Sequence, residues 1–156
     1  MLGRRNRNPQ RLLAVTSGGG HWIQLMRLRS AFDGLEQVFV CVDSDYREQV
    51  SGSRFHRVND ANQDSKVALL FLALRVLWVV LRERPDIVIS TGAAPGYFGL
   101  RFGKLLGART IWVDSIANAE IMSLSGRLVE PYADLWLTQW EELAAEGGPE
   151  YRGQVL

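Results

Sequence analysis

Two short apolar segments of this 156-residue chain each run straight into a glycine-rich turn, and this repeated junction constrains the fold more than any other feature. Leu12–Thr16 leads into Ser17-Gly-Gly-Gly-His21, and Asp86–Ser90 leads into Thr91-Gly-Ala-Ala-Pro-Gly96. After the first turn, apolar residues recur at the three- and four-residue spacing of a helix. The first junction therefore predicts a strand, a tight turn and a helix, and the second predicts another strand that opens into a glycine-rich loop.

The rest of the chain continues this alternation of short apolar segments with longer helical ones. Nearly all-apolar strands that alternate with helices are typical of a parallel sheet covered on both faces. The sequence therefore predicts an α/β fold with a doubly wound, mostly parallel, Rossmann-like sheet. Further strands are predicted at Gln37–Val42, Arg54–Val58, Thr110–Asp114 and, as the last strand, Leu135–Thr138, and helices at Lys66–Arg84, Tyr97–Leu106 and Leu124–Ala133.

Charge and cysteine content limit the classes of function. A net charge of +1 argues against nucleic acid as a partner, although arginines gather near the amino terminus. Residues 1–10 are predicted to form a basic disordered arm that either stays in solvent or meets anionic lipid head groups, and residues 11–156 a single domain. Because Cys41 is the one cysteine and no signal peptide follows the basic start, we expect a reducing cytoplasmic setting without disulfides or a thiolate metal cluster.

The loops that follow the strands are expected to form the ligand site, because open α/β sheets bind ligands outside the carboxyl ends of their strands. The glycines of the two turns let a ligand approach the backbone, and N–H groups at the start of the next helix favour a phosphate. The alternative is that these glycines serve only tight packing. A nicotinamide dinucleotide is disfavoured because Ile23 occupies the third glycine position of that fingerprint, and the sequence has no P-loop pattern.

Two titratable residues stand at the predicted strand ends. His21 lies in the first turn of a helix beside the glycines, where it either contacts a substrate or diphosphate oxygen or only caps the helix. Asp114 ends an apolar strand and acts either as a general base and binder of sugar hydroxyls or as a carboxylate that caps its loop. His56 has no such setting and is expected to face solvent from a strand. His21 and Asp114 are therefore the catalytic candidates.

Several segments together resemble a known family. They are Ser17-Gly-Gly-Gly-His21, Ser90-Thr-Gly-Ala-Ala-Pro-Gly96, Val113-Asp-Ser-Ile-Ala-Asn118, Ser123-Leu-Ser-Gly-Arg-Leu128, Pro131, and Ala133-Asp134 through to Gln139-Trp140. This combination is similar to the acceptor-side subunits of split GT-B glycosyltransferases. Its relatives include bacterial PssD-type exopolysaccharide proteins, the eukaryotic subunit that recruits the enzyme adding the second N-acetylglucosamine of dolichol-linked oligosaccharide, and the N-terminal half of MurG.

The resemblance implies an inverting transferase that works only with a partner and binds a lipid-diphosphate-linked sugar as acceptor. It also implies that a separate, PssE-like chain holds most of the nucleotide-sugar donor, a UDP-sugar, and that no cofactor or metal is needed. Many relatives carry Glu in place of Asp114 and Arg in place of Asn118. The residues that the resemblance assigns to the acceptor are Ser17, Gly18, Gly19, Gly20, Thr91, Gly92, Ala93, Pro95, Gly96, Ser115 and Asn118, and those assigned to the partner interface are Gln139 and Trp140.

A membrane contact is the remaining expectation. Val67–Leu81 is apolar except for Arg75, but its fifteen residues are too few for a bilayer span, which takes about 20. This helix is either part of the core or a peripheral contact with the cytoplasmic face of the inner membrane. Two other functions stay open: a non-catalytic scaffold that anchors and stimulates the partner, and, from fold alone, a flavodoxin-like binder of a small phosphate ligand.

Overall fold

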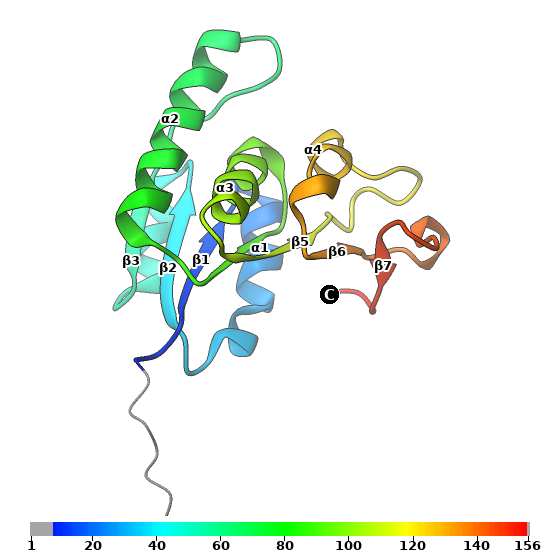
Figure 1. The fold of residues 1–156 in the computed structure, drawn as a ribbon, viewed down its shortest axis with the longest axis horizontal. Coiled ribbons are helices and arrows are strands. Elements are labelled where there is room, and N and C mark those ends of the chain that lie inside the picture. The colour runs from blue at the N-terminus through cyan, green and yellow to red at the C-terminus, as the bar shows by residue number, and fades with distance from the viewer. Residues whose placement is uncertain (1–7, 156) are drawn as a thin grey trace, which may run out of the picture.

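The computed structural model describes residues 8–155, so most of the predicted basic arm at 1–10 lies outside the described residues. A seven-stranded sheet with the order β3-β2-β1-β4-β5-β6-β7 forms its centre, and all neighbouring strands are parallel (Figure 1). This confirms the predicted doubly wound, Rossmann-like α/β fold. The elements are β1 Arg11–Val15, α1 Gly20–Arg27, β2 Glu36–Cys41, β3 Arg54–Arg57, α2 Lys66–Glu83, β4 Ile87–Ser90, α3 Ala93–Leu105, β5 Arg109–Val113, α4 Leu124–Leu128, β6 Leu135–Thr138 and β7 Glu150–Tyr151, with 3-10 turns at Arg29–Phe32, Ser44–Val50, Glu130–Tyr132 and Glu141–Leu143.

Alternate residues of the central strands pack on opposite faces of the sheet, because side chains along a strand point to alternate sides. Leu13 and Val15 of β1 belong to the core beneath α2, α3 and α4. Leu12 and Ala14 belong to a second core beneath α1 and the turn that follows it, around Trp22. Both faces of β1 are buried after Arg11, which explains why the four residues from Leu12 to Val15 are all apolar.

Several predicted ends, such as those of β2 and β5, differ from the observed ones by one residue, and three predictions differ by more. Helix α3 begins at Ala93 rather than Tyr97, because Pro95 lies in its first turn, where a missing N–H costs no intrahelical hydrogen bond. The predicted helix 124–133 is wrong beyond Leu128, since Pro131 stands in a separate 3-10 turn. Strand β6 is not the last, because two exposed residues form β7 without any apolar pattern that would indicate a strand.

Glycines let α3 lie close against the sheet and so position its first turn at the strand ends. A Cβ at Gly96 would lie 1.8 Å from Ser90 Oγ, and a Cβ at Gly103 would lie 2.5 Å from a methyl group of Val88. Neither position has room for a side chain. At Gly96, in the second glycine turn, the lack of a side chain therefore serves tight packing, which is the alternative to a ligand-binding role.

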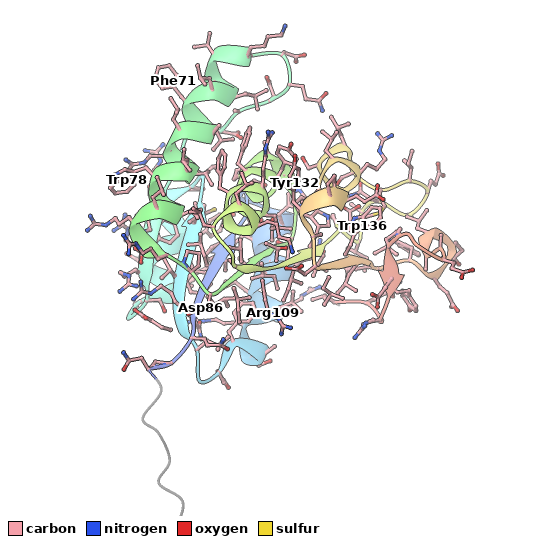
Figure 2. All side chains as sticks on the ribbon, viewed as in Figure 1. Phe71, Trp78, Asp86, Arg109, Tyr132 and Trp136 are labelled. Atoms are coloured by element: carbon pink, nitrogen blue, oxygen red, sulfur yellow. The ribbon has the colours of Figure 1, made fainter. Side chains whose placement is uncertain are left out.

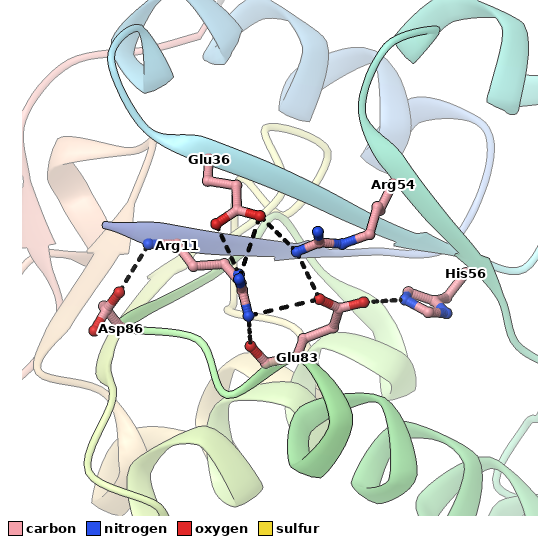
Figure 3. Close-up of polar contacts among 6 residues, drawn as sticks. All are labelled: Arg11, Glu36, Arg54, His56, Glu83 and Asp86. Atoms are coloured by element: carbon pink, nitrogen blue, oxygen red, sulfur yellow. Dashed lines mark hydrogen bonds and ion pairs between the residues drawn. The ribbon is translucent and has the colours of Figure 1, made fainter. Parts of the chain in front are cut away.

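Charged residues join β1, β2 and β3 to the end of α2 (Figure 3). Glu83 is 4% exposed, and its carboxylate pairs with Arg54 at 2.8 Å and with His56 Nε2 at 2.7 Å. The expectation that His56 faces solvent is therefore wrong, because its ring turns inward to this carboxylate. A hydrogen bond from Arg11, with a further one from Arg54, lowers the pKa of Glu36 below its ordinary value.

Candidate functional site

The carboxyl ends of three adjacent strands, β1, β4 and β5, bring the loops of the predicted crevice together. A cavity of about 490 Å³ opens there. Its polar lining residues come mainly from α1, the loop before α2 and the loop after β5, whereas most of its apolar ones come from α2, α3 and α4. The lining residues are His21, Ala61, Asn62, Gln63, Leu69, Ala93, Ala94, Tyr97, Phe98, Ser115, Ala117, Asn118, Ser123, Leu124, Ser125 and Leu128.

His21 and Thr91 tie the two glycine turns to each other. His21 Nδ1 lies 3.0 Å from the Thr91 carbonyl oxygen, and Thr91 Oγ1 donates to the His21 carbonyl oxygen at 2.6 Å. A carbonyl oxygen only accepts, so Nδ1 carries the proton and Nε2 of the neutral ring is left as an acceptor. Gly92 makes room for this ring, since a Cβ there would lie 2.4 Å from Nδ1.

The amino termini of α1 and α3 both open onto this region without a side-chain cap. Gly19 and Gly92 occupy the capping positions, and neither can supply a side-chain acceptor for the first N–H groups of its helix. The short helix α4 differs, because Ser123 Oγ accepts from the Gly126 N–H. Two helix starts with free N–H groups and positive dipole ends suit an anionic group such as a phosphate.

Asp114 is buried behind the cavity at 1% exposure. Its carboxylate accepts from Trp112 Nε1 at 3.1 Å, from Asn118 Nδ2 at 3.1 Å, and from the N–H and hydroxyl of Ser123 at 2.9 and 2.6 Å. A Cβ at Gly126 would lie 2.5 Å from Asp114 Oδ1, so the surroundings are also tightly packed. Of the two roles predicted for Asp114, the geometry favours the carboxylate that organises its loop over the general base.

Comparison with known proteins identifies the family. A family model described as "Oligosaccharide biosynthesis protein Alg14 like" matches residues 47–155, which is more than half of the chain. The chain belongs to this family. The UDP-N-acetylglucosamine transferase subunit ALG14 of Yarrowia lipolytica is 25% identical over 97% of this chain and 83% of its own length. The subunit of the same name from Mus musculus is 24% identical over 88% of this chain and 78% of its own length.

Solved structures show the same fold at low sequence identity. MurG from Acinetobacter baumannii has a TM-score of 0.70 at 10% identity, over 89% of this chain and 44% of the MurG chain. The S. aureus MnaA–UDP co-structure has a TM-score of 0.63 at 14% identity, over 83% of this chain and 39% of that one. This Alg14-like chain therefore spans less than half the length of these two structures and has the fold of the N-terminal half of a GT-B glycosyltransferase.

The predicted acceptor residues of the Alg14-like chain fall into two groups. Ala93, Ser115 and Asn118 line the cavity together with the catalytic candidate His21, where two glycine turns and the loop after β5 meet. The other predicted acceptor residues do not line it. In the first glycine turn, which also contains Ser17, Gly18 and Gly20, the Gly19 N–H donates to the Tyr46 hydroxyl at 3.0 Å. In the second turn the remaining residues are buried: Thr91, Gly92, Pro95 and Gly96.

The two predicted interface residues make contacts inside the molecule. Gln139 is 1% exposed and presents no surface to a partner in this structure, which argues against the interface role predicted for its side chain. Trp140 is partly exposed, and its Nε1 donates to the Ile116 carbonyl oxygen at 2.8 Å. An interface role for Trp140 stays a prediction.

The apolar walls of the cavity were not predicted from the sequence. Tyr97 and Phe98 follow the second glycine turn on α3, and Leu124 and Leu128 are four residues apart on α4, so helical spacing was the available signal. The loop at 61–63 gave no signal, because its polar residues are ordinary for a turn. None of the helices among residues 8–155 combines the length and apolar character needed to cross a bilayer.

Proposed function

We propose that this Alg14-like chain is the acceptor-binding subunit of a two-component inverting glycosyltransferase in lipid-linked oligosaccharide or polysaccharide synthesis. The observation that carries the proposal is the cavity, where two helix N-termini without side-chain caps and several polar side chains lie beside apolar side chains. Such a site suits an acceptor that combines a diphosphate, a sugar and a lipid tail. The diphosphate would lie at the starts of α1 and α3, and the lipid would leave along Leu69, Leu124 and Leu128.

His21 is the residue we assign as general base. Its Nδ1–H is held by the Thr91 carbonyl oxygen, so Nε2 is free to accept a proton within the cavity. In the proposed reaction the acceptor hydroxyl gives its proton to Nε2 while its oxygen bonds to the anomeric carbon of the donor sugar. The bond from that carbon to the nucleoside diphosphate breaks at the same time, and the nucleoside diphosphate departs with the electron pair.

The donor site is assigned to a partner chain. The chain corresponds to less than half of MurG, and its curated relatives carry the word subunit in their names. A PssE-like partner that holds the UDP-sugar would supply the other half of the GT-B cleft, and no cofactor beyond this donor is required. A PssD-type role in exopolysaccharide synthesis fits the same arrangement.

The outer face of α2 is proposed to lie on the membrane. One face of this helix packs on the sheet through Leu72, Val76 and Val80, so the core interpretation holds for that face and the proposed membrane contact concerns the outer face. Figure 2 shows Phe71 and Trp78 on the side that points away from α3. The exposed apolar residues recur along this one face at Val67, Leu70, Phe71, Leu74, Trp78 and Leu81.

Charge supports a lipid surface as the occupant of this face. The guanidinium carbons of Arg75 and Arg82 lie 4.8 and 5.4 Å from the ring centroid of Trp78. Lys66 is exposed as well, whereas the acidic residue of this helix, Glu83, is buried. Apolar side chains with flanking cations suit an anionic bilayer, where each cation near the surface contributes about 1 kcal/mol.

The decisive experiment measures transfer of labelled sugar to a lipid-diphosphate acceptor by the chain, by its partner and by both together. We expect transfer only by the complex, and a loss of about 100-fold in His21→Ala. His56→Ala is the matched control. His56 lies on β3, contacts Glu83 of α2 and does not line the cavity. Submicromolar binding of a UDP-sugar by the chain alone would contradict the division into two components, and full activity of His21→Ala would indicate the scaffold function.

Flotation with anionic vesicles tests the membrane face. We expect the complex to float with the vesicles, to resist salt and to be released by detergent, because apolar side chains enter the bilayer. Phe71→Ser with Leu74→Ser is expected to abolish flotation. Leu105→Ser is the control, since this leucine is 70% exposed but lies on another helix. A complex that stays in the soluble fraction even at low salt would show that α2 does not meet the membrane.

A further inference from the structure

Two buried glutamines lie behind the cavity and connect distant segments of the chain. Gln24 is on α1, one turn after His21, and is 5% exposed; Gln139 follows β6 and is 1% exposed. Gln139 Nε2 donates to Gln24 Oε1 at 2.5 Å and to the Asp114 carbonyl oxygen at 2.8 Å. Gln24 Nε2 donates in turn to Ser115 Oγ at 3.2 Å. The hydrogen bonds of the two amides therefore lead to Ser115, which lines the cavity.

Backbone groups determine which way round each amide lies. The Val155 N–H donates to Gln139 Oε1 at 2.7 Å, and the Asp114 carbonyl oxygen can only accept from Nε2. In the same way, the Ile116 N–H donates to Gln24 Oε1 at 3.3 Å. Turning over either amide would place donor against donor, so the orientation follows from the backbone.

These orientations decide what the Ser115 hydroxyl can do. Its oxygen accepts from Gln24 Nε2 at 3.2 Å and from the Ala117 N–H at 3.2 Å, which uses both lone pairs. The hydrogen bonds of residues 8–155 include none in which the Ser115 O–H donates to a protein atom. Since the side chain lines the cavity, this proton is left for a ligand.

We propose that Gln24 and Gln139 are positioning residues that keep Ser115 as a donor-only hydroxyl and so make it a specificity-determining contact. Ser115 then selects an acceptor oxygen that carries no proton, of the kind found in a diphosphate or an acyl group. His21 Nε2 complements it, because that atom accepts from a hydroxyl. The identity of the ligand rests on the proposed function, whereas the orientation of the two amides does not.

Gln24→Glu tests the proposal with little change of shape. One carboxylate oxygen still accepts from Gln139 and from the Ile116 N–H, but the other now accepts the Ser115 proton and takes it from the cavity. With a short-chain prenyl-diphosphate sugar as acceptor, the complex is expected to show a KM raised about ten-fold and a kcat within about two-fold of wild type. Ser115→Ala should match this change, and Gln24→Glu should add nothing to Ser115→Ala.

Gln49→Glu is the matched control. Gln49 Oε1 accepts from Trp22 Nε1 at 2.9 Å outside the cavity, and a carboxylate keeps that bond. This variant is expected to retain the wild-type KM. An unchanged KM in Gln24→Glu, or effects of Gln24→Glu and Ser115→Ala that simply add, would overturn the role of Ser115.

Hydrogen exchange of the two glutamine side-chain amides, measured by NMR on the full chain, tests the hydrogen bonds from Gln139 to Gln24 and from Gln24 to Ser115 without a sugar acceptor. Both amides are expected to exchange slowly in the wild type, and the Gln24 amide is expected to exchange faster in Gln139→Leu. Fast exchange of these amides in the wild type would refute this hydrogen-bonded arrangement. Absence of transfer by the wild-type complex, in contrast, would contradict the proposed function and leave the exchange result standing.

Discussion

Asp114→Asn is expected to destabilise the chain and not only to slow a reaction. Asp114 Oδ1 accepts from Trp112 Nε1 and the Ser123 hydroxyl, and Oδ2 accepts from Asn118 Nδ2 and the Ser123 N–H. The side chain is 1% exposed, so water does not replace a lost partner. An asparagine must put an NH2 group at one of these two oxygen positions.

Each orientation of the asparagine sets its NH2 against a donor that cannot turn. At the Oδ2 position it meets the Ser123 N–H, and at the Oδ1 position it meets Trp112 Nε1. A buried N–H without an acceptor costs about 1–3 kcal/mol, and the remaining bonds lose their charge. The free energy of unfolding is therefore expected to fall by about 2–4 kcal/mol, against a total of roughly 5–15 kcal/mol for a domain.

Urea denaturation followed by tryptophan fluorescence measures this change. Asp33→Asn is the control, because Asp33 is exposed and the same loss of charge there should alter the free energy of unfolding by less than about 0.5 kcal/mol. A decrease below about 0.5 kcal/mol in Asp114→Asn would refute the reasoning. If such a stable variant also lost transfer in the complex, the general-base role predicted for Asp114 would be restored.

Three further changes test the fold. Gly96→Ala should lower the free energy of unfolding by about 2 kcal/mol or more in the same denaturation assay, because its Cβ would lie 1.8 Å from Ser90 Oγ. Arg84→Gly should raise it by up to about 1 kcal/mol, since Arg84 ends α2 with a φ of 48° that glycine adopts without strain. A hydrogen bond from Lys104 lowers the pKa of Asp134, so this carboxylate stabilises the fold above about pH 4 and the contribution disappears as pH falls through the lowered pKa. Denaturation of wild type and Asp134→Asn from pH 7 to pH 3 should therefore show a difference that shrinks in acid, and a constant difference would contradict it.

Hydrophobic periodicity and turn residues were sufficient to predict the architecture. Buried strands such as Leu12–Thr16 are apolar on both faces, and this pattern allows only a sheet covered on two sides. The carboxyl-end rule then placed His21 and Ser115 in one crevice, where both line the observed cavity. The two-residue strand β7 was missed because hydrogen bonding to a neighbour, and not its own residues, makes it a strand.

The roles of polar side chains depended on contacts between segments far apart in the chain. His21 meets the carbonyl of Thr91 across 70 residues, and Gln139 meets Gln24 across 115 residues. The sequence placed Asp114 at the crevice but did not reveal that four donors already occupy its carboxylate. Apolar patterning survives shifts of several ångströms because burial is not directional, whereas a hydrogen bond requires its donor and acceptor atoms within about 3.5 Å of each other and in line. Element order therefore follows from local residue patterns, but which acid, amide or imidazole faces the ligand follows from how the packed loops meet.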